Sequence, residues 1–285
     1  MIGFWLVNLL IPGDPENVKI TTSSGEWNIL KYAAKFQESK NAIDVGQCAQ
    51  TYSIENGASL EDSSEICEKC FEEMTPILLG MSYLSGLSVT AKYPLPYSDC
   101  SGIIRPSDSW PRERAICGSN FCVTNEIEYA EVLEKFVVAW CSNGRTEQAL
   151  ILIHHWLDAL ACWSFENLYL CATTLLQIIA KTEKQIIGNR SLSLFCAINS
   201  ASRRAGIDPL SEDFKKMRND LIHEGKLIGS SFSGKSFEDC CHVVADLLIW
   251  FDEYIHSTLN LGPVKRKRYM WHNFENLNSF SIENF

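Results

Sequence analysis

The stretch that decides the fold of the C-terminal half is residues 236–259, SFEDCCHVVADLLIWFDEYIHSTL. Its apolar residues recur three or four positions apart and therefore line one side of a helix. The residues of this stripe are Phe237, Cys240, Val244, Leu247, Leu248, Phe251 and Ile255. The opposite side carries Glu238, Asp239, Asp246 and Glu253. The pattern predicts an amphipathic helix that is stabilised by packing its apolar stripe against other helices.

Further helices are predicted upstream of this stretch. They cover residues 126–142, 146–184 and 192–206, and one more begins at Asp208-Pro209. The second is either one long buried helix or two helices broken near Phe165. The third ends at Gly206, because glycine readily takes the left-handed conformation found at helix C-termini. Proline is allowed in a first turn, which favours a helix start at Pro209. The C-terminal part is thus predicted to be a bundle of four or five helices.

The N-terminal part has mixed signals. Strands are predicted at residues 4–11, 18–22 and 87–93, and helices at residues 27–38 and 63–86. The first of these helices is inferred because Trp27, Leu30 and Ala34 share one face at helical spacing. Residues 39–60 are polar and are expected to be irregular. The pattern indicates a small α+β region.

The best candidate for a domain boundary lies between residues 94 and 122. Residues that interrupt helices and strands crowd this stretch: Pro94, Pro96, Gly102, Pro106 and Pro111. We therefore expect an N-terminal α+β region in residues 1–110, a helical bundle in residues 111–262 and a basic, aromatic tail in residues 263–285. The expected fold class is mainly α, with the bundle preceded by the smaller α+β region.

The chain is acidic. It holds 25 Lys and Arg against 35 Asp and Glu, which is a net charge of −10 over 285 residues. Because phosphate neutralisation supplies most of the non-specific affinity for nucleic acid, this balance argues against a protein that coats DNA or RNA. It is compatible with a small, locally basic RNA site.

The apolar segments are too short for a membrane span. The longest candidate, residues 2–11, is broken by Asn8 and falls well below the ~20 residues that a bilayer requires. It also lacks the basic start and the small-residue cleavage site of a secretory signal. We expect a cytoplasmic protein without a membrane partner.

The chain has twelve cysteines, and without a secretory signal we expect reduced thiols. A free cysteine packs as a small hydrophobe, so those in apolar stretches are predicted to be core residues. This group includes Cys141, Cys162, Cys171 and Cys196.

Four other cysteines form a candidate zinc site, because two short-spaced pairs can supply four thiolates. The pairs are Cys67 with Cys70 and Cys117 with Cys122. Cys67 and Cys70 also fall on the apolar face of the helix predicted at residues 63–86. Core packing is therefore the favoured interpretation, and we expect no metal and no cofactor.

The most informative segment is residues 217–225, MRNDLIHEG. It ends at Gly225, so it lies at the end of one helix, before the loop to the helix of residues 236–259. Arg218 and His223 are five residues apart, or about 140° around an ideal helix. They share an edge only if the helix ends near His223.

The pattern Arg218-Asn219-x-x-x-His223, placed before the last helix of a bundle, resembles the Arg-x4–6-His signature of the HEPN superfamily. Residues 214–225, 194–206 and 168–180 are similar to the ApeA-like branch of that superfamily. The resemblance covers residues 125–260, about half of the chain.

The resemblance implies a HEPN-like bundle that acts as a metal-independent endoribonuclease of the toxin or antiviral-defence kind. Its active site would form across a homodimer, with two motifs facing one cleft. His223 would move a proton, because imidazole titrates near neutral pH. Arg218 would hold the phosphate through two donors, and Asn219 would orient the histidine or bind the phosphate. The N-terminal region would sense a trigger, bind a regulatory partner or restrain the nuclease.

Other interpretations of these residues stay open. Arg218 and His223 can instead satisfy carbonyl groups at the helix end and pair with Asp220 or Glu224. The bundle can also be a non-catalytic module that binds RNA, a nucleotide or a protein, or the chain can be a zinc-stabilised structural protein.

The only strongly basic run is Lys265-Arg266-Lys267-Arg268, followed by Tyr269 and Trp271. Cations interleaved with aromatic rings can hold a single RNA strand through phosphate contacts and base stacking. A charged run near a terminus is also typical of a solvated tail. The four basic residues are therefore RNA-binding candidates.

Overall fold

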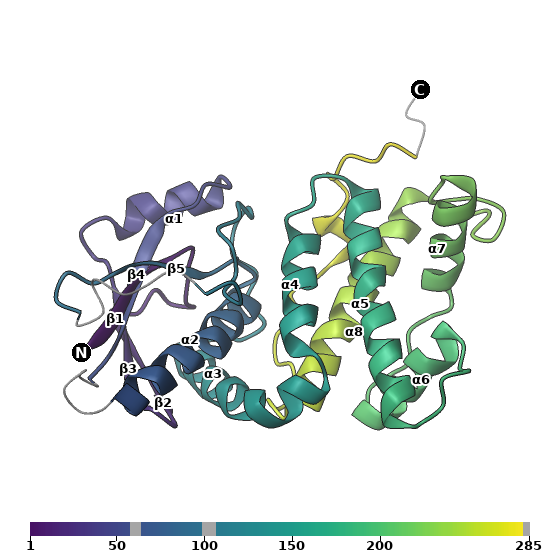
Figure 1. The fold of residues 1–285 in the computed structure, drawn as a ribbon. Helices are drawn as coiled ribbons and strands as arrows, with labels where there is room; N and C mark the ends of the chain where they lie inside the picture. Colours follow the sequence, from purple (N-terminus) through teal and green to yellow (C-terminus); the bar gives the residue numbers. More distant parts are fainter. Residues whose placement is uncertain (58–63, 99–106, 282–285) are drawn as a thin grey trace. The chain divides into compact units, whose positions relative to one another are not determined.

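The computed structural model describes residues 1–57, 64–98 and 107–281, with side chains from residue 68 onward in the second range. The chain forms two compact units (Figure 1). The N-terminal unit is Met1–Gly144 with Leu259–Leu261. The helical unit is Arg145–Thr258 with Gly262–Phe285. This arrangement confirms an α+β N-terminal region and a helical C-terminal part.

The N-terminal unit is built on a five-stranded antiparallel sheet of order β2-β3-β4-β1-β5. The strands are β1 (Ile2–Val7), β2 (Asn17–Thr22), β3 (Gly25–Lys31), β4 (Gln50–Asn56) and β5 (Thr90–Pro94). Its helices are α1 (Phe36–Asp44), α2 (Ser64–Ser85) and α3 (Glu126–Ala139), and α3 continues into the π-helix η1 (Trp140–Gly144). Helix α1 packs against β4, and α3 packs against α2 and β2.

The helix predicted at residues 27–38 is wrong. Residues 25–31 form strand β3, and α1 begins only at Phe36. Trp27 and Ile29 are fully buried and alternate with half-buried residues, which is the two-residue period of a strand. Pairing with β4 places Ile29 opposite Ile54 and selects this period over the helical one. Residues 39–57, the described part of the stretch expected to be irregular, contain most of α1 and all of β4.

The division between the two units falls after Gly144, later than the boundary expected between residues 94 and 122. Helix α3 belongs to the N-terminal unit through its contact with α2. A Cβ atom at Gly80 of α2 would lie 2.6 Å from Leu133 and 3.0 Å from Phe136, so the glycine permits the two helices to approach closely. On the other side of α3, Glu134 accepts a 2.6 Å hydrogen bond from the backbone N–H of Thr21 on β2.

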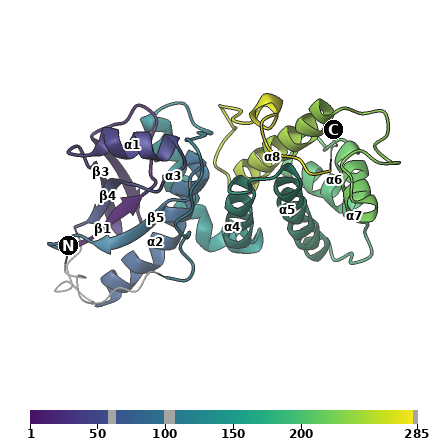
Figure 2. The same cartoon turned by 90° about the horizontal axis from the view of Figure 1, so that it is seen from above.

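The helical unit is a bundle of five α-helices in the described part of the chain. They are α4 (Ala149–Leu160), α5 (Phe165–Ile186), α6 (Leu194–Ala205), α7 (Asp213–Glu224) and α8 (Phe237–Thr258), followed by the 3-10 turn η2 (Trp271–Asn273). Helix α5 is central, since it contacts α4, α6, α7 and α8 (Figure 2). The apolar stripe predicted for residues 236–259 is confirmed: from Cys240 onward all its members are fully buried.

The helix ends follow local chemistry. Of the two alternatives for residues 146–184, the structure has two helices, with the break next to Phe165. Ser164 caps α5 by accepting a hydrogen bond from the N–H of Asn167. Gly206 ends α6 in the left-handed conformation (φ 67°), as predicted. Helix α7 does not begin at Asp208-Pro209, and residues 207–211 are non-helical.

Candidate functional site

The predicted motif lies on α7, which ends at Gly225 in the left-handed conformation (φ 69°). Phe214, Met217 and Asp220 form the buried side of this helix. Arg218 and Asn219 are half-buried, and His223 is exposed in the last turn. The predicted helix end next to His223 is therefore confirmed.

The geometry of α7 separates Arg218 from His223. The helix is regular through Glu224, so the two residues are about 140° apart around its axis and about 7.5 Å apart along it. Asn219 and His223, four residues apart, share a face instead. One copy of α7 thus presents the guanidinium and the imidazole on different sides of the helix.

Arg218 makes no ion pair or hydrogen bond through its side chain with any residue that the structure describes. Its Nε atom is buried and has no acceptor. The guanidinium lies near Tyr169 of α5, whose hydroxyl donates a hydrogen bond to the backbone carbonyl of Phe214. Burial raises the pKa of Tyr169, and the positive charge of Arg218 opposes this rise. The positive charge of Arg218 is thus not neutralised by any carboxylate within the described chain.

The two carboxylates of the motif have other partners. Asp220 accepts hydrogen bonds from the backbone N–H groups of Gly229 (2.9 Å), Ser231 (3.0 Å) and Phe232 (2.7 Å). Glu224 accepts from the backbone and the hydroxyl of Ser230. Both therefore fasten the loop between α7 and α8. The interpretation in which Asp220 or Glu224 neutralises Arg218 or His223 is wrong for the described chain.

Asp220 is a positioning residue whose role the sequence interpretation missed. Its burial disfavours the charged form, but the N–H groups of Phe232, Ser231 and Gly229 outweigh this effect and hold the pKa of its carboxyl below the usual range. The fixed charge thus holds in place the loop that follows His223. The sequence did carry a signal for this role: an aspartate on the buried side of the predicted helix, shortly before the glycine- and serine-rich residues 225–236.

The basic run divides between exposed and buried residues. Lys265, Arg266 and Lys267 are exposed. Arg268 is 4% exposed and ion-paired with Asp252, so its assignment as an RNA contact is wrong. Residues 263–285 are not simply a solvated tail, since Tyr269 and Phe274 are buried as well. Arg268 is buried because its ion pair with Asp252 and its contact with the ring of Trp156 compensate for the loss of water around its charge.

Three of the four cysteines of the candidate zinc set have described side chains. Cys70 and Cys122 are buried, Cys117 is exposed, and the side chain of Cys67 lies outside the described residues. Among the described side chains there is no group of three or more His, Cys, Asp or Glu that could hold a metal ion.

The prediction that four other cysteines are core residues is wrong as well. Cys141 and Cys196 are exposed, and Cys162 and Cys171 are half-buried. Cys162 lies in the turn between α4 and α5. The other three lie on helices that bury only part of their surface, so a cysteine in an apolar stretch does not automatically lie on the buried side.

A second polar cluster joins parts of the helical unit that are far apart in sequence. Arg204 of α6 donates to Glu147 (2.8 Å) and to Glu183 of α5 (2.8 Å). Tyr254 of α8 also donates to Glu147 (2.5 Å), and Ser200 donates to Glu183 (2.8 Å). Glu147 is 5% and Glu183 1% exposed, so a single guanidinium compensates two buried carboxylates. No local motif signals this cluster, because its members are up to 107 residues apart.

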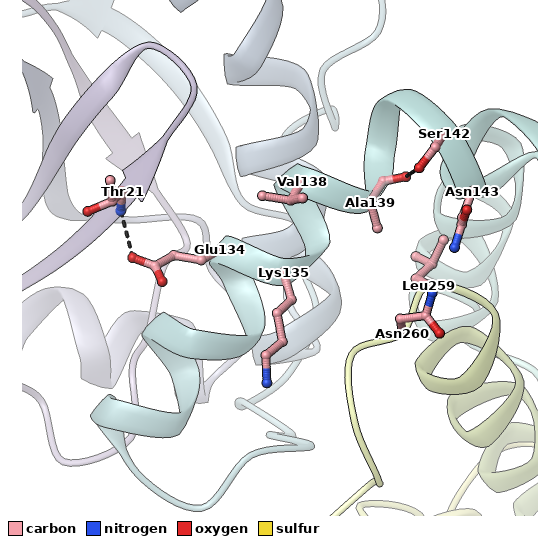
Figure 3. Close-up of a pocket in the computed structure, with 9 residues that line it drawn as sticks. All are labelled: Thr21, Glu134, Lys135, Val138, Ala139, Ser142, Asn143, Leu259 and Asn260. Atoms are coloured by element: carbon pink, nitrogen blue, oxygen red, sulfur yellow. Dashed lines mark hydrogen bonds between the residues drawn. The ribbon is translucent and has the colours of Figure 1, made fainter.

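The N-terminal unit has a cavity of about 470 Å³ along α3 and η1 (Figure 3). Thr21, Glu134, Lys135 and Ser142 are among its lining residues. The Glu134 carboxylate already accepts from the backbone of Thr21, and the Ser142 hydroxyl donates to the carbonyl of Ala139. None of the predicted site residues lines this cavity.

Comparison of the chain with known proteins identifies no relative. No family model, no curated protein and no solved structure matches it. No helix in the described residues has both the length and the apolar character that a membrane span requires.

Proposed function

We propose that this protein is a metal-independent endoribonuclease of the HEPN type that cleaves RNA in a cleft between two copies of α7. The observation that carries the proposal is the state of Arg218. It is a half-buried cation that no described carboxylate neutralises, on the same helix as the exposed imidazole of His223. An unpaired guanidinium is suited to a phosphate, which it can bind through two parallel hydrogen bonds.

The chemistry needs a base and an acid. The imidazole of one copy takes the proton of a ribose 2′-hydroxyl, whose oxygen attacks the adjacent phosphorus. The imidazolium of the other copy donates a proton to the departing 5′-oxygen as the P–O bond breaks. The products are a 2′,3′-cyclic phosphate and a 5′-hydroxyl. Arg218 stabilises the charge that develops on the non-bridging oxygens.

Two features of α7 favour a shared cleft. Each copy supplies one histidine in the motif, whereas the reaction uses two proton-transfer groups. Arg218 and His223 also lie about 140° apart around the helix, so in the proposed cleft a phosphate held by Arg218 of one copy meets the imidazole of the other. Asn219 shares the face of His223, and in the proposed complex it binds the same RNA.

The test is cleavage of a single-stranded RNA by the purified full-length chain in the presence of a metal chelator. His223→Ala is expected to lower the cleavage rate by about 100-fold or more, the usual contribution of a general acid or base. The matched control is His242→Ala, which removes an exposed histidine of α8 and should leave the rate unchanged. The expected products carry 2′,3′-cyclic phosphate ends.

Three outcomes would contradict the proposal. They are undiminished cleavage by the His223 variant, products with 3′-hydroxyl ends, and RNA binding by the wild-type chain without any cleavage. The last would favour the non-catalytic binding module. Tolerance of Arg218→Lys would point to that alternative too, because lysine supplies charge without the paired donors of arginine.

A further inference from the structure

Two thiols of the helical unit lie side by side. The Sγ atoms of Cys162 and Cys171 are 3.8 Å apart. Cys162 lies in the turn between α4 and α5, and Cys171 lies on α5, in its second turn. Both side chains are half-buried, so small oxidants can reach them.

The surroundings hold this pair in place. Ser164 lies two residues after Cys162 in the same turn. It caps α5 and forms a β-bridge with Asn278. Glu166 accepts hydrogen bonds from the hydroxyl of Ser279 and from the backbone N–H of Phe280 (3.0 Å). The turn is therefore tied both to the first turn of α5 and to the C-terminal segment, which keeps the two thiols together.

The contact between the thiols favours ionisation of one of them. The hydrogen bond between the two sulfur atoms outweighs the opposing effect of burial and lowers the pKa of Cys171 to about 7. The same bond, together with burial, raises the pKa of Cys162. A thiolate is the reactive form of cysteine, so Cys171 is the nucleophile of the pair.

We propose that Cys162 and Cys171 are a redox modification site, at which a hydroperoxide forms a reversible disulfide within the chain. The Cys171 thiolate attacks an oxygen of hydrogen peroxide, the O–O bond breaks, and the released hydroxide takes a proton to become water. The resulting sulfenic acid is attacked by the sulfur of Cys162; the S–O bond breaks and a second water leaves. Two thiols and one peroxide thus yield one disulfide and two waters.

Disulfide formation requires the two sulfur atoms to move closer. Bonded sulfurs are about 2.05 Å apart, so the Sγ atoms, which are 3.8 Å apart here, must approach by roughly 1.8 Å. Cys141 and Cys196 are more exposed but have no described sulfur within contact, so they can form sulfenic acid without an internal partner. This site does not depend on the ribonuclease activity proposed above.

The experiment is to treat the full-length protein with hydrogen peroxide, alkylate the remaining thiols under denaturing conditions and digest without reductant. Cleavage after Glu147, Glu166 and Glu183 gives peptides 148–166 and 167–183, each of which contains one cysteine of the pair and no other. The expected result is a cross-linked species of these two peptides that a reductant separates. Absence of this species while Cys141 or Cys196 is oxidised would overturn the proposal.

Cysteine variants distinguish a disulfide specific to Cys162 and Cys171 from general oxidation of the thiols. Cys162→Ser and Cys171→Ser should each abolish the cross-linked species, and Cys196→Ser, which removes an exposed cysteine of α6, should retain it. In Cys162→Ala the alkylation of Cys171 should need a higher pH, moving from near 7 toward the ordinary thiol value of about 8.5. An unchanged alkylation profile in Cys162→Ala would show that the two thiols do not interact, which contradicts the proposed mechanism.

Discussion

Arg268 and Asp252 form a buried ion pair with two hydrogen bonds, 2.9 Å from Nε and 2.6 Å from Nη2 of the guanidinium to the two carboxylate oxygens. The side chains are 0% and 3% exposed. The ring of Trp156 lies 4.6 Å from the guanidinium carbon, so α4, α8 and the C-terminal segment meet at this point. The last residue of the basic run is therefore part of the core of the helical unit.

Removing this arginine should destabilise the helical unit. Arg268→Ala leaves the carboxylate of Asp252 buried without its partner, which typically costs about 3–5 kcal/mol. The measurement is the free energy of unfolding in urea. Arg266→Ala, at an exposed position of the same run, is the matched control and should change it by less than about 0.5 kcal/mol. Equal effects of the two substitutions would contradict the buried pair.

The cluster of Arg204, Glu147 and Glu183 should stabilise the helical unit through the balance of its charges, and not only through packing. Arg204→Ala leaves Glu147 and Glu183 buried together without a cation and is expected to cost roughly 3–5 kcal/mol of unfolding free energy. Adding Glu147→Gln should restore part of this loss, because it removes one of the two uncompensated charges. The neighbouring exposed Arg203→Ala should be nearly neutral. No recovery in the double variant would show that the loss comes from packing.

The carboxylate of Asp220 should make stability depend on pH. Its pKa is lower in the folded protein than in the unfolded chain, where it is about 3.9. Its contribution is therefore fully present above pH 4 to 5 and is lost as the pH falls through the folded-state pKa. Asp220→Asn should cost roughly 1–3 kcal/mol at pH 7, and the difference from wild type should shrink below pH 4. A difference that is constant from pH 7 to pH 3 would contradict this role.

A cleft shared by two copies predicts a specific effect of mixing. His223→Ala protein is added to wild-type protein at constant total concentration and the subunits are allowed to exchange. If both histidines of a dimer are needed, cleavage falls with the square of the wild-type fraction, because only wild-type pairs are active. If each chain acts alone, it falls linearly. Linear dependence after demonstrated exchange would contradict the shared cleft.

The helices of the bundle could be predicted from sequence because each carries its own signal. The stripe of α8, the glycine after α6 and the serine cap of α5 are local features, so neighbours along the chain suffice to define them. The strands were harder, since β3 is too short for its period to exclude a helix. Strand β4 has a polar sequence, yet Thr51, Ser53 and Asn56 are buried because β4 lies between β3 and β1.

The sequence by itself determined that Arg218, Asn219 and His223 lie on one helix and that this helix ends beside His223, because helix periodicity and a terminal glycine act over a few residues. Only the tertiary structure decided that no described carboxylate neutralises Arg218, that Arg268 is buried and that Cys162 meets Cys171. These relationships depend on how helices pack and on which partner each buried charge finds. Such contacts join residues that are distant along the chain, and no local pattern specifies them.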